Sequence, residues 1–141
     1  MKGSVPTLGG LERQVYYTAE YLRANGVHAD IANVYFEGLT PETIGQYDIV
    51  HIFNTGGPKG ALIMVAHMAK ALAKKVIFTP VYWPPDKLLE ELDRHGVRVM
   101  VHKDKNQWRV PMRRLIESAD IIVPNASMEW EATCKDLGIA Y

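Results

Sequence analysis

The chain has 141 residues, which suits one domain, and its sixteen Lys and Arg balance sixteen Asp and Glu, so its charge gives no general attraction to nucleic acid. The single cysteine, Cys134, cannot form an internal disulfide and is expected to fill the core on a late helix. No signal-peptide pattern opens the chain, and the longest apolar segment, residues 61–73, is too short to span a bilayer. We therefore expect one cytoplasmic domain over residues 1–141. The five histidines show no metal-ligand spacing, so no metal and no other cofactor is predicted.

The first predicted elements are a helix, a strand and a short helix. Residues 11–25 carry apolar side chains at helical spacing, and Gly26 follows where a left-handed cap is expected. Residues 28–34 are rich in Val, Ile and Ala and predict a strand. Thr40 followed by Pro41 predicts the start of a brief helix, since a capping residue then precedes a proline at the first helical position.

The rest of the chain alternates between strand and helix patterns. Residues 48–53 form a β-branched run that suits a parallel strand covered on both faces. Ser127 is expected to cap the last helix, and Gly96 to close an earlier one. The remaining predictions are helices over residues 60–74, 86–95 and 111–118 and strands over residues 75–80, 97–101 and 120–124.

This alternation predicts an α/β fold, a doubly wound, mostly parallel Rossmann-like sheet with helices on both faces. The usual first strand is missing, because residues 1–8 offer no run of strand-forming residues. Either the biological start lies upstream, or neighbouring strands or a second copy of the chain fill the gap. In such sheets ligands bind beyond the carboxyl ends of the strands, so the residues just after each strand are the candidates for function.

A glycine pair, Gly9-Gly10, stands directly before the first predicted helix. Glycine lets backbone N–H groups and the helix dipole approach an anion, although an ordinary turn is the alternative interpretation. The pair belongs neither to a G-x-G-x-x-G nor to a G-x-x-x-x-G-K-[ST] pattern. The sequence therefore predicts neither an NAD nor an ATP site.

Polar and aromatic residues follow two of the predicted strands. His51 lies within a strand and is expected to bond a backbone carbonyl in the core, whereas Asn54 at the strand's exit is better placed to meet a ligand. The pair Tyr82-Trp83 stands among prolines after the next strand. It predicts either a rigid platform for a sugar or lipid, or a packed loop.

One segment around Trp108 concentrates basic side chains. A solvated surface is the first interpretation of such a run. The alternative is a peripheral patch for anionic lipid headgroups or a phosphorylated acceptor, because basic side chains with an interfacial tryptophan favour a charged membrane surface. The basic residues are Lys103, Lys105, Arg109, Arg113 and Arg114.

Five segments, taken in order, resemble the N-terminal, acceptor-side domain of GT-B glycosyltransferases of family 4, also called glycosyl transferase group 1. The resemblance covers nearly the whole chain and implies half of a GT-B fold. It also implies a retaining, hexosyltransferase-like reaction from a nucleotide sugar to a sugar or lipid-linked acceptor. By the same resemblance, Gly9 and Gly10 lie in the cleft near the donor phosphates, and Asn54, Tyr82 and Trp83 contact the acceptor. The matching segments are Gly9-Gly10-Leu11-Glu12-Arg13 and residues 22–26, 48–54, 76–83 and 119–129.

The chain departs from the family pattern in three ways. The first strand is missing, Val81 stands where a histidine is often found, and 141 residues leave no room for the donor-binding domain with its paired glutamates. The isolated chain is therefore expected to be inactive without a separate donor-binding domain or self-association. The alternative to an enzyme is a non-catalytic acceptor- or membrane-binding module. A flavodoxin-like receiver is a weaker third interpretation, because the acidic cluster that a phosphoryl-accepting receiver needs is absent.

Overall fold

A computed structural model of the chain describes residues 9–34, 37–53, 59–82, 84–96 and 106–140. The chain divides into two compact units, Met1–Gly38 and Leu39–Tyr141, and each is described by itself. Several sequence predictions lie outside the described residues. They concern residues 1–8, the strand over residues 97–101, Asn54, Trp83, Lys103 and Lys105.

The first unit contains one helix, α1 (Gly10–Ala24), and an irregular segment after it. The predicted left-handed cap is confirmed, since Gly26 has a φ of 79°. The predicted strand over residues 28–34 is wrong: this segment carries no strand, and its Ile31 is exposed. Its chain instead turns back toward the end of α1, where Arg23 Nε donates to the Ala29 carbonyl at 2.7 Å. A segment forms a strand only where a neighbouring strand satisfies its backbone, and this segment pairs with none of the described strands.

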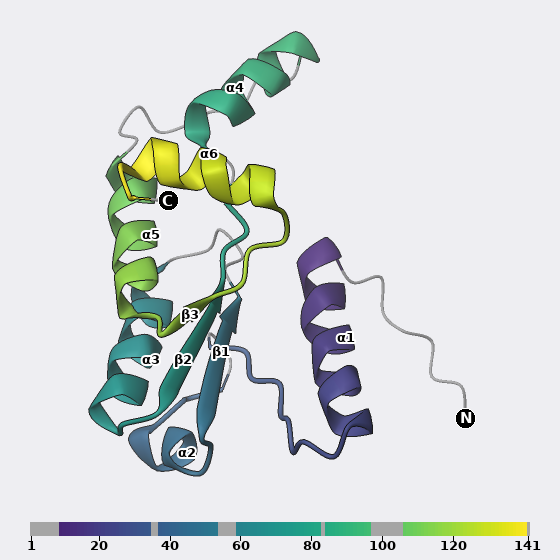
Figure 1. Cartoon of the computed structure of the whole chain (residues 1–141), viewed down its shortest axis with the longest axis vertical. Helices are drawn as coiled ribbons and strands as arrows, with labels where there is room; N and C mark the ends of the chain where they lie inside the picture. Colours follow the sequence, from purple (N-terminus) through teal and green to yellow (C-terminus); the bar gives the residue numbers. More distant parts are fainter. Residues whose placement is uncertain (1–8, 35–36, 54–58, 83, 97–105, 141) are drawn as a thin grey trace. The chain divides into compact units, whose positions relative to one another are not determined.

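The second unit is built on a parallel sheet in the order β1-β2-β3, which confirms three of the predicted strands (Figure 1). The strands are β1 (Ile49–Phe53), β2 (Lys75–Thr79) and β3 (Ile121–Ile122). Their register places Ile52 beside Phe78, and Phe78 beside Ile122. The second unit is therefore an α/β domain with a mostly parallel, Rossmann-like sheet.

The helices of this unit follow the predicted alternation with two corrections. Thr40 caps the short helix as predicted, because its hydroxyl accepts from Thr43 N at 3.3 Å. Ser127 does not cap the last helix: Ala126 is the capping residue, and it has no side chain to bond the helix N–H groups. The helix predicted from Pro111 begins five residues earlier, so that Pro111 stands inside it. The helices are α2 (Pro41–Gly45), α3 (Lys59–Ala71), α4 (Pro85–Arg94), α5 (Asn106–Ser118) and α6 (Ser127–Leu137).

The core of the second unit lies between the sheet and the helices α3 and α5. These two helices contact each other and the sheet, and they lie on the same side of it (Figure 1). Burial of a side chain such as Phe78 or Met112 stabilises the fold by roughly 1.5 to 3 kcal/mol. Within this unit α3 and α5 form one helical layer, whereas the sequence predicted helices on both faces. The buried side chains include Ile52, Val65, Ala66, Ala69, Val76, Phe78, Met112 and Leu115.

Asp120 fixes β3 beside β2 at the amino end of the sheet. Its Oδ2 accepts from Val76 N at 2.8 Å, and its own N–H donates to the Val76 carbonyl at the same distance. Its Oδ1 also accepts from Lys70 Nζ at 2.7 Å. The bond from Lys70 and the backbone bond from Val76 hold the pKa of this carboxyl below its ordinary value. These contacts give Asp120 a structural role in the sheet.

Candidate functional site

The predicted glycine pair opens helix α1. Gly9 is the extended capping residue and Gly10 the first helical residue, and both are exposed. A methyl group at Gly9 would lie 2.6 Å from Glu12 Oε2, so the chain's own carboxylate lies close to this helix N-terminus. A negative charge there is favourable because of the helix dipole. A donor phosphate at Gly9-Gly10 would have to displace Glu12, and this role stays a prediction.

The carboxyl ends of β1 and β2 bring a histidine and a threonine together. His51 Nε2 lies 2.8 Å from Thr79 Oγ1, so the partner of the ring is a side-chain hydroxyl and not the backbone carbonyl that we expected. The Phe53 ring stacks on the His51 ring with centroids 4.1 Å apart and an angle of 27° between the planes. Because Phe53 pairs with Thr79 in register and follows His51 by two positions, the three side chains share one face of the sheet.

Partial burial favours the uncharged form of the His51 ring. Desolvation lowers the pKa of His51 below its ordinary value of 6.5, because the charged imidazolium loses hydration there. A neutral imidazole has one nitrogen that donates and one that accepts. The tautomer therefore decides whether Thr79 donates to the ring or accepts from it.

Tyr82 is tied into the interior of the second unit. Its side chain is only 3% exposed, its hydroxyl donates to Asp136 Oδ2 at 2.7 Å, and its backbone N–H donates to Glu129 Oε1 at 2.9 Å. Burial, together with the bond to Asp136, raises the pKa of Tyr82 far above its ordinary value. Of the two interpretations of the Tyr82-Trp83 segment, the described residue therefore favours the packed loop. Contact of Tyr82 with an acceptor stays a prediction.

Arg109 joins the same group, which we call the polar cluster: Tyr82, Asp86, Arg109 and Asp136. Arg109 grips Asp136 in a bidentate pair, with Nε donating to Oδ2 at 3.0 Å and Nη2 to Oδ1 at 2.5 Å. Nη2 also reaches Asp86 Oδ2 at 3.5 Å. The bonds to Asp136 raise the pKa of the Arg109 guanidinium further. The cluster thus connects α4, α5, α6 and the segment after β2.

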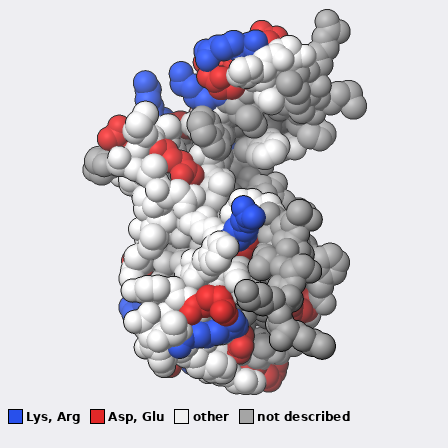
Figure 2. All heavy atoms as spheres, turned by 90° about the vertical axis from the view of Figure 1, so that its right-hand side faces the viewer, with Lys and Arg blue, Asp and Glu red and all other residues white. Residues whose placement is uncertain are grey.

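The predicted basic segment is divided by these contacts. Arg109 is engaged by the carboxylates of the polar cluster, and Arg113 Nε lies 3.3 Å from Glu117 Oε1 on the same helix. Arg114 is exposed. On the face drawn in Figure 2, basic and acidic atoms of the described residues lie next to one another and do not form a field of one sign. A membrane or phosphate patch would therefore depend on Arg113 and Arg114 among the described residues.

Sequence reasoning missed the acidic partners in this region. No local signal in the sequence marks Asp86, Glu129 or Asp136 as a partner of Tyr82 or Arg109. Each binds a residue far away in the chain, so spacing alone gives no pattern. Cys134 is buried on α6 as predicted, and burial raises the pKa of its thiol, which makes it a poor nucleophile.

The described residues hold no group of three or more His, Cys, Asp or Glu side chains placed to bind a metal ion. In the parts of the chain that the structure covers, no helix is both long and apolar enough to cross a membrane. Comparison with protein families, curated proteins and solved structures finds no match for this chain.

Proposed function

We propose that this chain is the acceptor-side half of a retaining GT-B glycosyltransferase, which transfers a sugar from a nucleotide-sugar donor to a sugar or lipid-linked acceptor. The observation that carries the proposal is the register of β1 and β2, in which Phe53 lies beside Thr79. β1 and β2, the two strands that the predicted acceptor residues follow in the sequence, therefore end side by side at the carboxyl edge of the sheet. That edge is where ligands bind in open α/β sheets.

The order of the elements supports the same proposal. The five segments that resemble family 4 occur in sequence on α1, β1, β2 and the β3–α6 connection, apart from those parts that lie outside the described residues. In a retaining transfer the departing diphosphate needs positive charge and helix dipoles. The groups that grip the donor would come from residues beyond these 141, in the same polypeptide or in another. We assign no catalytic residue to this chain.

The test is transfer of a labelled sugar from a panel of UDP-, GDP- and ADP-sugars. The chain is assayed alone and mixed with a donor-binding domain that carries the paired glutamates, such as one encoded beside it. We expect transfer with the mixture and little or none with the chain alone. Absence of transfer and of donor hydrolysis in both would contradict the proposal. In an active mixture, Asn54→Ala should raise KM for the acceptor, and Asn25→Ala, a change in the first unit after α1, should not.

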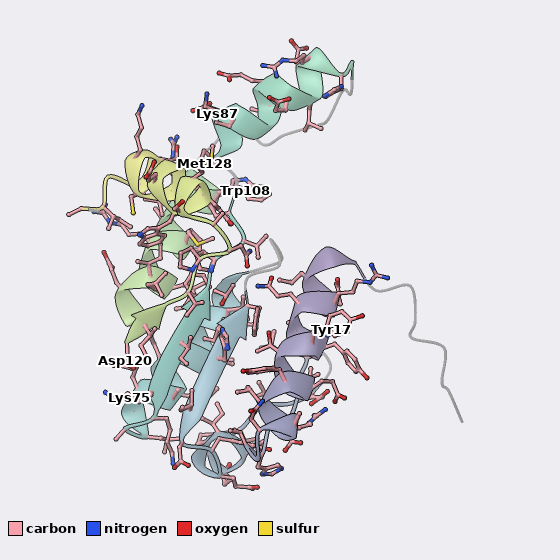
Figure 3. All side chains as sticks on the ribbon, turned by 45° about the vertical axis from the view of Figure 1, so that its right-hand side comes forward. Tyr17, Lys75, Lys87, Trp108, Asp120 and Met128 are labelled. Atoms are coloured by element: carbon pink, nitrogen blue, oxygen red, sulfur yellow. The ribbon has the colours of Figure 1, made fainter. Side chains whose placement is uncertain are left out.

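A non-catalytic membrane-binding module is the second candidate, favoured by apolar side chains on α5 and α6. Met128 is 80% exposed and Val110 is also exposed, and Trp108 and Met128 lie at the same end of the second unit (Figure 3). Arg113 and Arg114 lie on the same helix as Val110. Apolar side chains beside cations favour an anionic bilayer surface.

Flotation with vesicles separates this candidate from the first. The membrane-binding module predicts binding to phosphatidylserine-containing vesicles that weakens in salt and in an Arg113→Gln/Arg114→Gln variant. Arg94→Gln on α4, whose side chain already pairs with Glu91, is the matched control and should bind like the unmodified chain. Equal and negligible flotation with anionic and neutral vesicles would remove this candidate.

A further inference from the structure

We propose that His51, Thr79 and Phe53 form a subsite that binds a hydroxyl group of an uncharged, polyhydroxylated ligand such as a sugar. This inference rests on the proposed function, because it assigns the chemistry of the acceptor. None of the three residues was predicted from the sequence to bind a ligand.

The first step is position. His51 is the middle residue of β1 and Phe53 its last, and Thr79 is the last residue of β2. The three share one face of the sheet, and α3 and α5 pack on the face that carries the buried Ile52 and Phe78. The subsite thus lies where two parallel strands end, on the face that those two helices leave uncovered.

The second step concerns the ring nitrogen of His51 that Thr79 does not bond. Thr79 is 2% exposed and its hydroxyl occupies Nε2 of His51. No buried side-chain nitrogen or oxygen among the described residues lacks a partner. Because Nδ1 of His51 has no hydrogen bond to a described residue, this nitrogen is reachable from solvent. A ligand can therefore bond to the ring without breaking the pair.

The third step is the match between this ring and an alcohol. If Thr79 donates to Nε2, then Nδ1 carries the proton and donates. If Nε2 donates to Thr79, then Nδ1 accepts. A sugar hydroxyl both donates and accepts, so it bonds with either tautomer. A phosphate prefers a cation, and the partial burial of His51 favours the neutral ring.

The fourth step concerns the rest of the surface. Phe53 is half-buried and adds an aromatic ring beside the imidazole, and the same face carries Ile49, Ile77 and Ile121. The charged residue on this face, Lys75, stands at the amino end of β2, away from Thr79, and lies 3.8 Å from Asp120. An apolar surface with a small number of well-placed polar atoms is typical of sites for uncharged small molecules. These features favour the C–H and O–H groups of a sugar ring over an ionic ligand.

The test uses the unmodified chain and methyl glycosides of glucose, galactose, mannose and N-acetylglucosamine as probes. Titration is followed by NMR of the ¹⁵N-labelled histidine rings, which reports Nδ1 and Nε2 separately. We expect a saturable shift of the His51 Nδ1 signal with at least one probe. The exposed His67 on α3 is the internal control and should not shift. If Nδ1 accepts, a fully O-methylated form of the binding glycoside, which cannot donate, should lose the effect. If no probe moves His51 saturably, or if His67 moves equally, the proposal is overturned.

Variants separate the hydroxyl from simple packing. Thr79→Val should raise the apparent Kd of the binding glycoside roughly five- to tenfold, since it removes the hydrogen bond that orients the His51 ring. Thr79→Ser, which restores the hydroxyl, should recover the affinity. An affinity that follows side-chain shape and not the hydroxyl would overturn the role of the pair. The titration of the unmodified chain decides the proposal even if Thr79→Val fails to fold.

The outcome is distinguishable from that of the proposed function. Glycoside binding at His51 without sugar transfer in any mixture would support the subsite and contradict the transferase. Transfer with an acceptor KM that His51→Gln leaves unchanged would support the transferase and overturn the subsite.

Discussion

The Tyr82 hydroxyl donates to Asp136 Oδ2 at 2.7 Å, and these two residues are 54 positions apart in the chain. The bond fastens the segment after β2 to the last helix, close to the carboxyl edge of the sheet. Arg109 holds the same carboxylate from α5, so Asp136 has partners from two elements. The position of the segment that follows β2 therefore depends on α6.

Tyr82→Phe should lower the free energy of unfolding by about 1.5 kcal/mol, because a buried hydrogen bond to a charged group is lost. Urea unfolding followed by circular dichroism measures this change. Tyr21→Phe is the matched control, since Tyr21 is exposed on α1, and it should stay within about 0.5 kcal/mol of the unmodified chain. Equal stability of both variants would show that the Tyr82 bond contributes nothing.

Arg109→Met should destabilise the second unit by about 2 kcal/mol, because it removes a bidentate cationic partner from the Asp136 carboxylate, which is only 9% exposed. Arg113→Met removes an exposed pair on the same helix and should cost less than about 1 kcal/mol. Adding Asp136→Asn to Arg109→Met should cost less than the sum of the two single changes. If the losses in unfolding free energy of the two single variants simply add in the double variant, Arg109 and Asp136 do not stabilise each other.

Asp120→Asn should lower the free energy of unfolding at neutral pH. It should also make this free energy decrease less as the pH falls into the acid range. The folded pKa of Asp120 lies below the ordinary value of 3.8, so its contribution is present above that pH and is lost as the pH falls through the folded pKa. Urea midpoints measured against pH should therefore converge for the variant and the unmodified chain in acid. Asp93→Asn, an exposed position on α4, is the control. Parallel curves for Asp120→Asn at all pH values would rule out this linkage.

His51→Gln should remove a loss of stability that the unmodified chain shows in mild acid. The folded pKa of His51 lies below 6.5, so the unfolded chain binds the proton more readily. Stability is then fully present above pH 6.5 and decreases as the pH falls through the folded value. The measurement is the urea midpoint from above to well below this pH, with His67→Gln as the control. If the pH dependence of the urea midpoint persists in His51→Gln but vanishes in His67→Gln, then His67 and not His51 causes the loss of stability.

Local patterns predicted most of the second unit because they act over a few residues. β-Branched runs gave β1 and β2, and the Thr40-Pro41 pair gave the start of α2. The same kind of pattern failed at residues 28–34, since composition cannot tell whether a neighbouring strand is present. The prediction of Ser127 as a cap failed because the last helix begins one residue earlier than predicted, so that Ser127 is its first helical residue.

The candidate site could be predicted only in part. The chain pattern placed His51 in a strand, but its partner Thr79 is 28 positions away and is chosen by the register of β1 and β2. The basic run pointed to Arg109 as a surface charge, and its engagement by Asp136 depends on the packing of α5 and α6. Neither partner follows from spacing along the chain.

The sequence by itself determined the strands β1, β2 and β3 and the approximate positions of the helices, and that the strands of an alternating chain pair in parallel. Those properties follow from side-chain periodicity, capping residues and the need of each backbone group for a nearby partner. The tertiary structure alone decided that Thr79 bonds His51, that Asp136 binds both Tyr82 and Arg109, and that Asp120 holds β3 against β2. These contacts join residues that only packing brings together, because burial makes an unpaired polar group costly and so selects the partner that lies within reach.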